Sequence, residues 1–208
     1  MPFSFLNDAI LIVMEKLIKE IKKYIPWNEQ EEKDKALLLR ALEIQEDIFT
    51  RKNTVCHMTA SAWVVSKDRK KVLLAYHNIY DSWAWLGGHA DGEKDLLQVA
   101  IREVKEESGI ECVNPVMDNI YSLEVLTVDG HIKKGEYVSS HLHLNVTYLL
   151  EADPDAYIHY KPDENKAVGW FELNEVYKKS SEPWFIEHIY KKLNEKLING
   201  EFLSKSTM

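Results

Sequence analysis

Three glutamates crowd into five positions of the segment REVKEESG, residues 102–109. In a helix, residues three and four positions apart are neighbours, so Glu103, Glu106 and Glu107 are expected to project along one side. Like charges at this spacing repel each other and destabilise the helix unless a cation lies among them. Carboxylate oxygens are preferred ligands of Mg²⁺ and Mn²⁺, which share such sites with waters and substrate phosphates. The segment therefore indicates either a divalent-metal site or a solvated acidic helix face.

The surrounding sequence favours the metal site. The apolar residues that define the opposite, buried face of the same helix are Leu97, Ala100, Ile101 and Val104. A loop rich in glycine precedes this helix, and Gly109 is expected to end it. Gly87 and Gly88 in the loop allow close backbone approach to a ligand, and free carbonyls there could complete a coordination shell.

The segment from Gly87 to Ile110 resembles the Nudix box of the Nudix hydrolases. The pattern of that box is G-x5-E-x7-R-E-U-x-E-E-x-G-U, where U is a bulky aliphatic residue. The positions in register are Gly88, Arg102, Glu103, Val104, Glu106, Glu107, Gly109 and Ile110. The resemblance covers about residues 55–178.

One position of the box departs from the pattern. The first glutamate of the pattern falls on Lys94, and Glu93 stands one residue early. The length from Gly88 to Arg102 is kept, so we expect the loop to be reshaped without a deletion. In the family this glutamate mainly holds the loop and the helix together. The departure therefore bears on loop contacts and substrate preference more than on the metal site.

The resemblance implies an α/β fold, a Nudix-type α/β/α sandwich with a mixed sheet. It also implies hydrolysis of the pyrophosphate linkage of a nucleoside diphosphate joined to another moiety. Glu103, Glu106 and Glu107 would then bind Mg²⁺ or Mn²⁺. The Gly88 carbonyl would complete the metal site, and Arg102 would orient a neighbouring glutamate. Such a metal neutralises the diphosphate, lowers the pKa of a bound water and holds it in line for attack on phosphorus.

The general base stays open among three glutamates. Glu103 is one candidate. Glu164 is another, because the family often carries acids ahead of a Trp-Phe strand like Trp170–Phe171. Glu136, which precedes a strand that contains histidines, is the third. We rank Glu103 and Glu164 equally.

Aromatic and histidine side chains near the box suggest substrate contacts. Trp85 is expected to stack on a nucleobase at a wet site, although alternating aromatics at Trp83 and Trp85 also suit a strand that fills core. His89 and Gly87 are candidate contacts to the substrate's phosphates. Another pair, His141 and His143, shares one face of a predicted strand. Two histidines without a third ligand in sequence reach are more often polar-face residues, so we leave them out of the metal set, and we interpret His57 as structural.

Two other functions compete with hydrolysis. One is an isomerase on the same fold that resembles isopentenyl-diphosphate isomerase and uses a cysteine and a glutamate for proton transfer. Cys56 is the single cysteine before the box, and the intact glutamate helix favours hydrolysis. The other is a non-catalytic nucleotide sensor. Such sensors usually lose a box glutamate, and this chain has kept all three.

Hydrophobic periodicity places the elements that must position these residues. Apolar residues three and four apart predict a helix over residues 5–24, ended by Pro26. Asn28 followed by Glu31 resembles a helix N-cap with its reciprocal glutamate, opening a second helix to about Ile48. The strands predicted from alternating or β-branched runs are 55–65 and 71–77, joined as a hairpin, then 120–128, 139–151 and 168–171. A helix over 182–197 completes the chain.

We divide the chain into an N-terminal helical extension (residues 1–52) and a Nudix hydrolase domain (residues 53–208) that includes the C-terminal helix. Packing on the sheet is the default role of the extension, and covering the substrate entrance or forming a homodimer surface are alternatives. In the strand HLHLNVTYLL (141–150), the alternation predicts one buried face and one polar face.

The composition of the chain narrows its expected binding partners and its cellular location. The chain has 208 residues, with 26 basic and 34 acidic side chains and a formal net charge of −8. This charge argues against a general nucleic-acid surface and leaves a small nucleotide-like diphosphate as the expected partner. Two cysteines without metal-finger spacing favour a reducing, cytoplasmic location over a disulfide framework. No apolar run near the N-terminus approaches the roughly 20 residues of a membrane span, and we expect no signal peptide or membrane partner.

Overall fold

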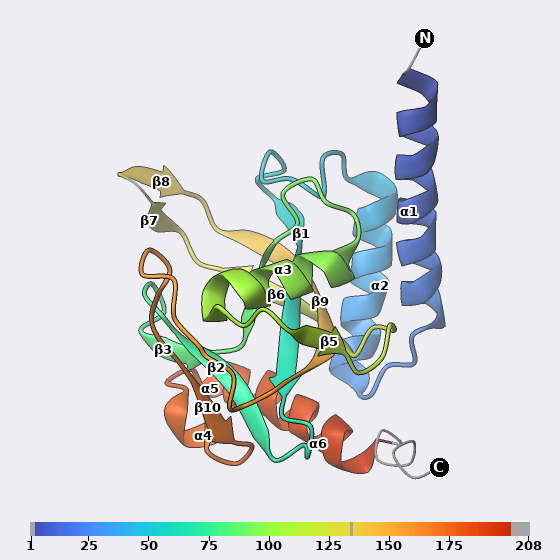
Figure 1. The fold of residues 1–208 in the computed structure, drawn as a ribbon. Helices are drawn as coiled ribbons and strands as arrows, with labels where there is room; N and C mark the ends of the chain where they lie inside the picture. Colours follow the sequence, from blue (N-terminus) through green and yellow to red (C-terminus); the bar gives the residue numbers. More distant parts are fainter. Residues whose placement is uncertain (1–2, 134, 201–208) are drawn as a thin grey trace. The chain divides into compact units, whose positions relative to one another are not determined.

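The computed structural model describes residues 3–133 and 135–200. Its helices are α1 (Phe3–Lys23), α2 (Glu29–Ile44), α3 (Leu96–Ser108), α4 (Val176–Lys179), α5 (Pro183–Phe185), the π-helical turn η1 (Ile186–Tyr190) and α6 (Lys191–Asn199). Its strands are β1 (Cys56–Val65), β2 (Lys71–His77), β3 (Ser82–Ala84), β4 (Leu86–His89), β5 (Val113–Pro115), β6 (Ser122–Val128), β7 (His131–Lys133), β8 (Glu136–Val138), β9 (His141–Ala152) and β10 (Asn165–Glu172). Figure 1 follows this path from blue to red.

These strands and helices confirm the α/β fold class. The hydrogen-bonded order in the main sheet is β10-β2-β1-β9-β5, with β3 on β2, β4 on β1 and β6 on β9. The fold is a mixed, curled sheet with helices, and two helices precede it in the chain. The part of the chain that the structure describes contains no helix long and apolar enough to cross a membrane.

The chain forms two compact units, each built from separated segments. Unit 1 contains the described residues up to Ser61, Gly87–Arg102 and Met117–Tyr148. Unit 2 contains Ala62–Leu86, Glu103–Val116 and the described residues from Leu149 onward. The division of the chain at residues 52 and 53 stays a prediction.

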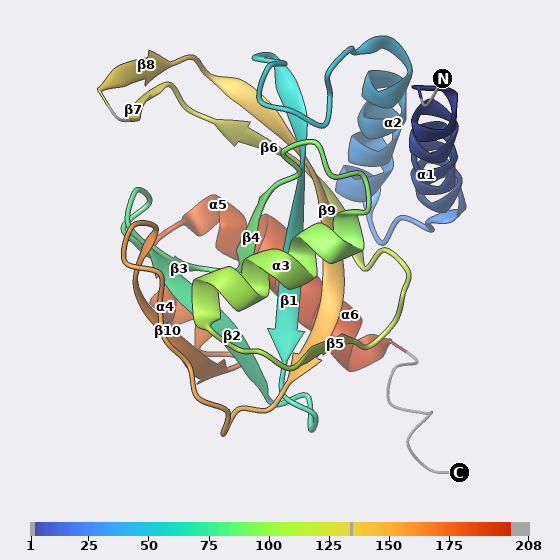
Figure 2. The same ribbon diagram turned by 45° about the horizontal axis from the view of Figure 1, so that its top comes forward.

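In unit 1 the two N-terminal helices lie side by side, as Figures 1 and 2 both show. Asn28 is the N-cap of α2, because its side chain accepts a hydrogen bond from the Glu31 backbone N–H at 3.0 Å. Glu31, the glutamate of the predicted capping box, accepts a hydrogen bond from the Trp27 N–H at 2.7 Å. The helix also ends at Ile44, four residues before the predicted end.

Helix α2 packs on strand β6 through polar contacts. Glu31 is fully buried, and the Ser122 hydroxyl on β6 donates to its Oε1 at 2.7 Å. Asp34 Oδ2 accepts from the Val125 N–H at 3.2 Å. The default role of the N-terminal extension, packing on the sheet, is therefore what α2 does within this unit.

The face of β9 that we predicted to be polar is polar but enclosed. Strands β6 and β9 pair antiparallel, with Glu124 opposite Asn145. Asn145 is 1% exposed, and its side-chain amide donates to Glu124 Oε2 at 3.0 Å. The Thr59 and Ser61 hydroxyls on β1 donate to Asn145 Oδ1 at 2.9 and 3.0 Å. A buried polar group needs hydrogen-bond partners, and this face supplies them from three strands.

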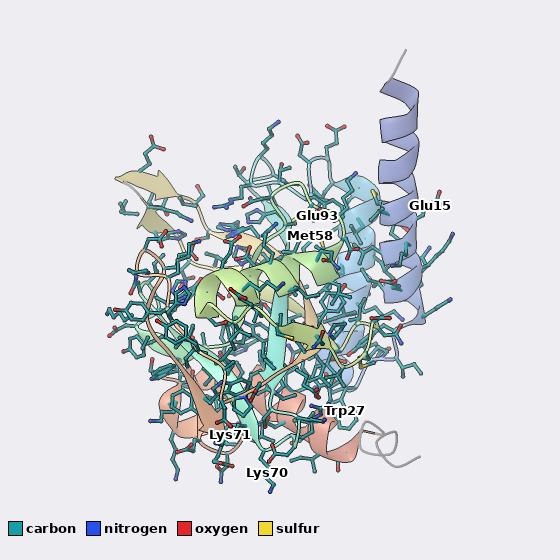
Figure 3. All side chains as sticks on the ribbon, viewed as in Figure 1. Glu15, Trp27, Met58, Lys70, Lys71 and Glu93 are labelled. Atoms are coloured by element: carbon teal, nitrogen blue, oxygen red, sulfur yellow. The ribbon has the colours of Figure 1, made fainter. Side chains whose placement is uncertain are left out.

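In unit 2 the predicted hairpin is present. Strands β1 and β2 pair antiparallel, and β10 pairs with β2 along most of its length. Figure 3 labels Lys70 and Lys71 at the hairpin turn, which Arg69 passes with a positive φ of 61°. Tyr190 stacks on Trp63 with a centroid distance of 5.6 Å. The predicted C-terminal helix is thus present as α5, η1 and α6 in succession, and its π-helical turn carries this core tyrosine.

Candidate functional site

Helix α3 presents the three box glutamates in different environments. Its first turn is capped by Asp95, whose carboxylate accepts from the Gln98 N–H at 3.3 Å. Within unit 2, Glu106 is exposed and Glu103 is half-buried. Glu107 is only 5% exposed, and the side-chain amide of Asn165 donates to its Oε1 at 3.3 Å. One helix therefore carries one buried and two accessible carboxylates at the predicted spacing.

Gly109 ends α3 as predicted, with a positive φ of 71°. Its N–H donates to the Lys105 carbonyl at 2.9 Å. A Cβ at this position would lie 2.0 Å from Nδ1 of the exposed His159 ring, which would have to move, and the positive φ would strain any other residue. The glycine of the box thus suits the end of the helix close to its last glutamate.

A lysine that the sequence did not single out joins two of the predicted site residues. Lys161 Nζ lies 3.5 Å from Glu106 Oε2 and 3.2 Å from Glu164 Oε2. Partial burial lowers the pKa of this ammonium, but the Glu164 and Glu106 carboxylates outweigh that effect and raise the pKa. The structure therefore brings the candidate base Glu164 and the candidate metal ligand Glu106 to one cation. Lys161 begins the segment KPDEN, whose Pro-Asp pair is typical of a turn, and no other feature of the sequence pointed to this lysine.

In unit 1 the reshaped loop is held by Glu93. Its Oε1 accepts from the N–H groups of Lys94 and Asp95 at 2.7 and 2.9 Å. Figure 3 labels Glu93 in the segment that leads into α3. Gly92 donates its N–H to the Phe49 carbonyl at 2.7 Å, and Lys94 Nζ lies 5.7 Å from the centroid of the Phe49 ring. Glu93, one residue early, thus makes contacts within the loop, to the two residues that precede α3.

Arg102 and Gly87 have structural contacts in the same unit. The Arg102 guanidinium donates to the His89 carbonyl at 3.2 Å, which ties the helix to the glycine loop. A Cβ on Gly87 would lie 2.5 Å from the Ala60 carbonyl oxygen, so only glycine fits against β1. Gly88 is half-buried in β4. The use of its carbonyl as a metal ligand stays a prediction.

The two tryptophans before the loop pack against other aromatic rings in unit 2. Trp83 contacts Phe171 edge to face at a centroid distance of 4.6 Å. Trp85 makes T-shaped contacts with Phe185 and Tyr190, both at 6.2 Å. Both indoles remain half-buried. These contacts agree with the core-filling interpretation, and stacking of Trp85 on a nucleobase stays a prediction.

Four histidines that are far apart in the sequence meet in unit 1. The ring centroid of His57 lies 5.1 Å from that of His89, 4.8 Å from that of His141 and 5.0 Å from that of His143. Burial lowers the pKa of His143 to about 2 and that of His89 to about 3. The sequence pairs His141 with His143 on one strand, but the rings of His57 and His89 join them only through the fold, from β1 and β4.

The comparisons with known proteins identify the family. A model of the NUDIX domain matches residues 56–193, which is most of the chain. The protein therefore belongs to the Nudix family, and the enzyme class defined by this membership is a Nudix-type pyrophosphohydrolase. No curated protein sequence matches this chain.

Solved structures share the fold at low sequence identity. A dihydroneopterin triphosphate pyrophosphohydrolase from E. coli is 17% identical with a TM-score of 0.50, covering 68% of this chain and 95% of that one. An Ap4A hydrolase from C. elegans is 20% identical with a TM-score of 0.48, covering 69% and 98%. The Nudix hydrolase RenU from M. Smegmatis is 15% identical with a TM-score of 0.49, covering 69% and 86%. At these identities the similarity concerns the fold alone.

Proposed function

We propose that this protein is a metal-dependent hydrolase that cleaves the pyrophosphate linkage of a nucleotide-like diphosphate. The observation that carries the proposal is the set of carboxylates on α3, Glu103, Glu106 and Glu107, within a chain that belongs to the Nudix family. Hard oxygen donors of this kind suit Mg²⁺ or Mn²⁺.

The residues present fit such a cation. Glu106 and Glu164 already share a positive charge, the Lys161 ammonium, at 3.5 and 3.2 Å. Glu107 is held in place by the Asn165 amide, so its position does not depend on the ion. A bound divalent metal would supply charge neutralisation of the diphosphate and a water of lowered pKa.

The chain's own residues would hold the metal and accept the proton of the attacking water. Glu106 and Glu107 would hold the metal, and the Gly88 carbonyl is proposed as a further ligand. Either Glu103 or Glu164 would take the proton from the attacking water, since both are accessible carboxylates in unit 2. Arg102 would keep the glycine loop attached to α3 through the His89 carbonyl. Substrate contacts at Gly87, His89 and Trp85 belong to the same proposal.

The test is a hydrolysis assay over a panel of diphosphate compounds. The panel holds nucleoside triphosphates, sugar nucleotides, ADP-ribose, dinucleoside polyphosphates, pyrophosphate-containing cofactors and isopentenyl diphosphate, each with Mg²⁺, with Mn²⁺ and with chelator. We expect hydrolysis of at least one nucleotide-like member, abolished by the chelator. Absence of any hydrolysis, or isomerisation of isopentenyl diphosphate instead, would overturn the proposal.

A pair of variants locates the activity. Glu106→Gln removes a charged ligand and should lower turnover by orders of magnitude. Glu195→Gln, an exposed glutamate on α6, should leave turnover unchanged. Equal activity in both variants would place the metal elsewhere. A cytoplasmic location, a homodimer and the lack of a nucleic-acid partner remain parts of the proposal that other measurements must address.

A further inference from the structure

A cluster of histidine rings in unit 1 offers a second set of metal ligands. His57 is the second residue of β1, His89 is the last of β4, and His141 and His143 alternate along β9. One ligand nitrogen from each of His57, His89 and His143 lies within 4.8 Å of the other two. His141 Nε2 lies 3.2 Å from His143 Nε2. These nitrogens come from three strands, so the fold itself holds them together.

Backbone carbonyls fix the orientation of two of these rings. His57 Nδ1 lies 3.0 Å from the Asn53 carbonyl, and His141 Nδ1 lies 2.8 Å from the Ser139 carbonyl. A carbonyl can only accept, so in each ring Nδ1 carries the proton and Nε2 presents a lone pair. A ring nitrogen bonded to a carbonyl while the other points at an ion is the usual arrangement of metal-binding histidines.

The Nε2 atom of His57 has no hydrogen-bond partner among the residues that the structure describes, and it is buried. The side chain as a whole is only 4% exposed. A buried acceptor without a partner is unfavourable by about 1–3 kcal/mol. A hydrogen-bond donor or a metal ion at this lone pair would remove that cost, and the other ring nitrogens gathered around it favour the metal ion.

The donor atoms of the cluster select a cation over an anion. The carbonyl contacts at Nδ1 leave Nε2 of His57 and of His141 as a lone-pair donor, and ligand nitrogens of His89 and His143 lie within 4.8 Å of that of His57. Imidazole lone pairs do not attract a phosphate, whereas they are preferred ligands of zinc, copper, nickel and iron. Two nitrogens on one tetrahedral zinc ion lie about 3.3 Å apart when each bond is about 2.0–2.1 Å. The His141 and His143 nitrogens already have this separation.

We propose that His57, His89, His141 and His143 form a transition-metal site that binds an ion of the Zn²⁺ class. Its imidazole donors differ in kind from the carboxylates of α3, which suit Mg²⁺ or Mn²⁺. His89, which the proposed function uses as a substrate contact, would also be a ligand of this ion.

Metal binding to the intact protein tests the site directly. The full chain is stripped with a chelator, and Zn²⁺ is titrated by calorimetry in an excess of Mg²⁺. Co²⁺ is titrated in parallel and followed by its visible absorption. We expect one equivalent of Zn²⁺ to bind despite the Mg²⁺, and the melting temperature to rise because the ion binds only the folded state. An intact protein that binds neither ion overturns the proposal.

Single substitutions assign the ligands. His143→Gln and His141→Gln each remove one nitrogen and should weaken Zn²⁺ binding by at least about tenfold. His131→Gln is the matched control, because His131 Nδ1 makes the same contact with a carbonyl two residues earlier, at 2.9 Å, outside the cluster. Glu106→Gln should also keep full Zn²⁺ affinity, which separates this site from the proposed catalytic one.

Circular dichroism checks that each variant is folded. His141→Gln carries the test if His143→Gln does not fold, since His141 is the first residue of its strand. Folded variants of both histidines that bind Zn²⁺ as tightly as the intact protein would overturn the assignment. So would a loss of Zn²⁺ binding in Glu106→Gln alone.

Discussion

Two groups of glutamates in this molecule have opposite surroundings. In unit 1, Glu31 and Glu124 are each 0% exposed. Glu31 accepts hydrogen bonds from the Tyr24 hydroxyl, the Trp27 N–H and the Ser122 hydroxyl, at 2.5, 2.7 and 2.7 Å. The same serine hydroxyl also contacts Glu124. In unit 2, Glu106 is exposed and forms an ion pair with the ammonium of Lys161.

This difference separates glutamates that stabilise the fold from glutamates that we propose to bind a metal ion. Glu31 and Glu124 are satisfied by neutral donors that the fold holds in place, so they have no need of a metal ion. Glu106 and Glu164 face a lysine on a flexible stem, and we propose that a divalent cation takes its place. Partner type thus separates Glu106 and Glu164 from Glu31 and Glu124, whereas Glu107, buried and bonded to the neutral Asn165 amide, shares features of both groups.

The largest expected effect belongs to Glu107→Gln. Glutamine keeps the shape and the hydrogen bond from Asn165 but removes the charge that would bind the metal. Turnover on the true substrate should fall by orders of magnitude, while the urea midpoint of unfolding stays close to that of the intact protein. Near-normal turnover in this variant would assign Glu107 to the fold-holding group.

Glu31→Ala is the opposite case and should act on stability. The substitution removes the buried carboxylate that accepts from the Trp27 N–H and from the Tyr24 and Ser122 hydroxyls, of which Ser122 keeps its contact with Glu124. We expect a loss of about 2–4 kcal/mol in the free energy of unfolding, with unchanged turnover per folded molecule. Urea denaturation measures the loss. Glu32→Ala, an exposed neighbour on the same helix, is the control and should change stability by less than about 0.5 kcal/mol.

Sequence patterns predicted the elements that carry the box because the signals there are local. Asp95 and Gly109 lie at the two ends of α3, and the hairpin of β1 and β2 follows from alternation and a short turn. Helix periodicity alone predicted that Glu103, Glu106 and Glu107 project along one side of α3. Such features depend on neighbours within a few positions, which a single sequence displays.

The contacts that the sequence did not predict depend on the tertiary fold. Lys161 reaches Glu106 across 55 positions of the chain, and His57 meets His143 across 86. The polar face of β9 was identified correctly, but its enclosure was not, since the donors to Asn145 come from β1. The alternation of polar residues cannot tell a solvated face from one covered by another polar strand.

Lys161→Met tests whether the lysine competes with the metal. The variant removes the ammonium between Glu106 and Glu164 and leaves two carboxylates to be neutralised by the ion. Two charges about 4 Å apart at a wet surface interact by about 1 kcal/mol. The Mg²⁺ concentration for half-maximal activity should therefore fall by up to about fivefold, which a metal titration of turnover measures. An unchanged Mg²⁺ concentration for half-maximal activity would show that Lys161 does not compete with the metal. A higher one would show that Lys161 assists the metal-bound state.

The smallest effect is expected at Arg51 and Asp91, an exposed ion pair in unit 1. The hydrogen bond from Arg51 is the main cause that lowers the pKa of the Asp91 carboxyl. A depressed folded-state pKa adds stability above the unfolded value of about 3.9, and that stability is lost as the pH falls through the folded pKa. Because both side chains are about half exposed, Arg51→Gln should cost less than about 1 kcal/mol at neutral pH. Urea unfolding of the two proteins at neutral pH and below about pH 3 should show this difference shrinking with acid. A constant difference across that range would mean that Arg51 acts by packing, and that the charge of Asp91 contributes nothing to holding the loop.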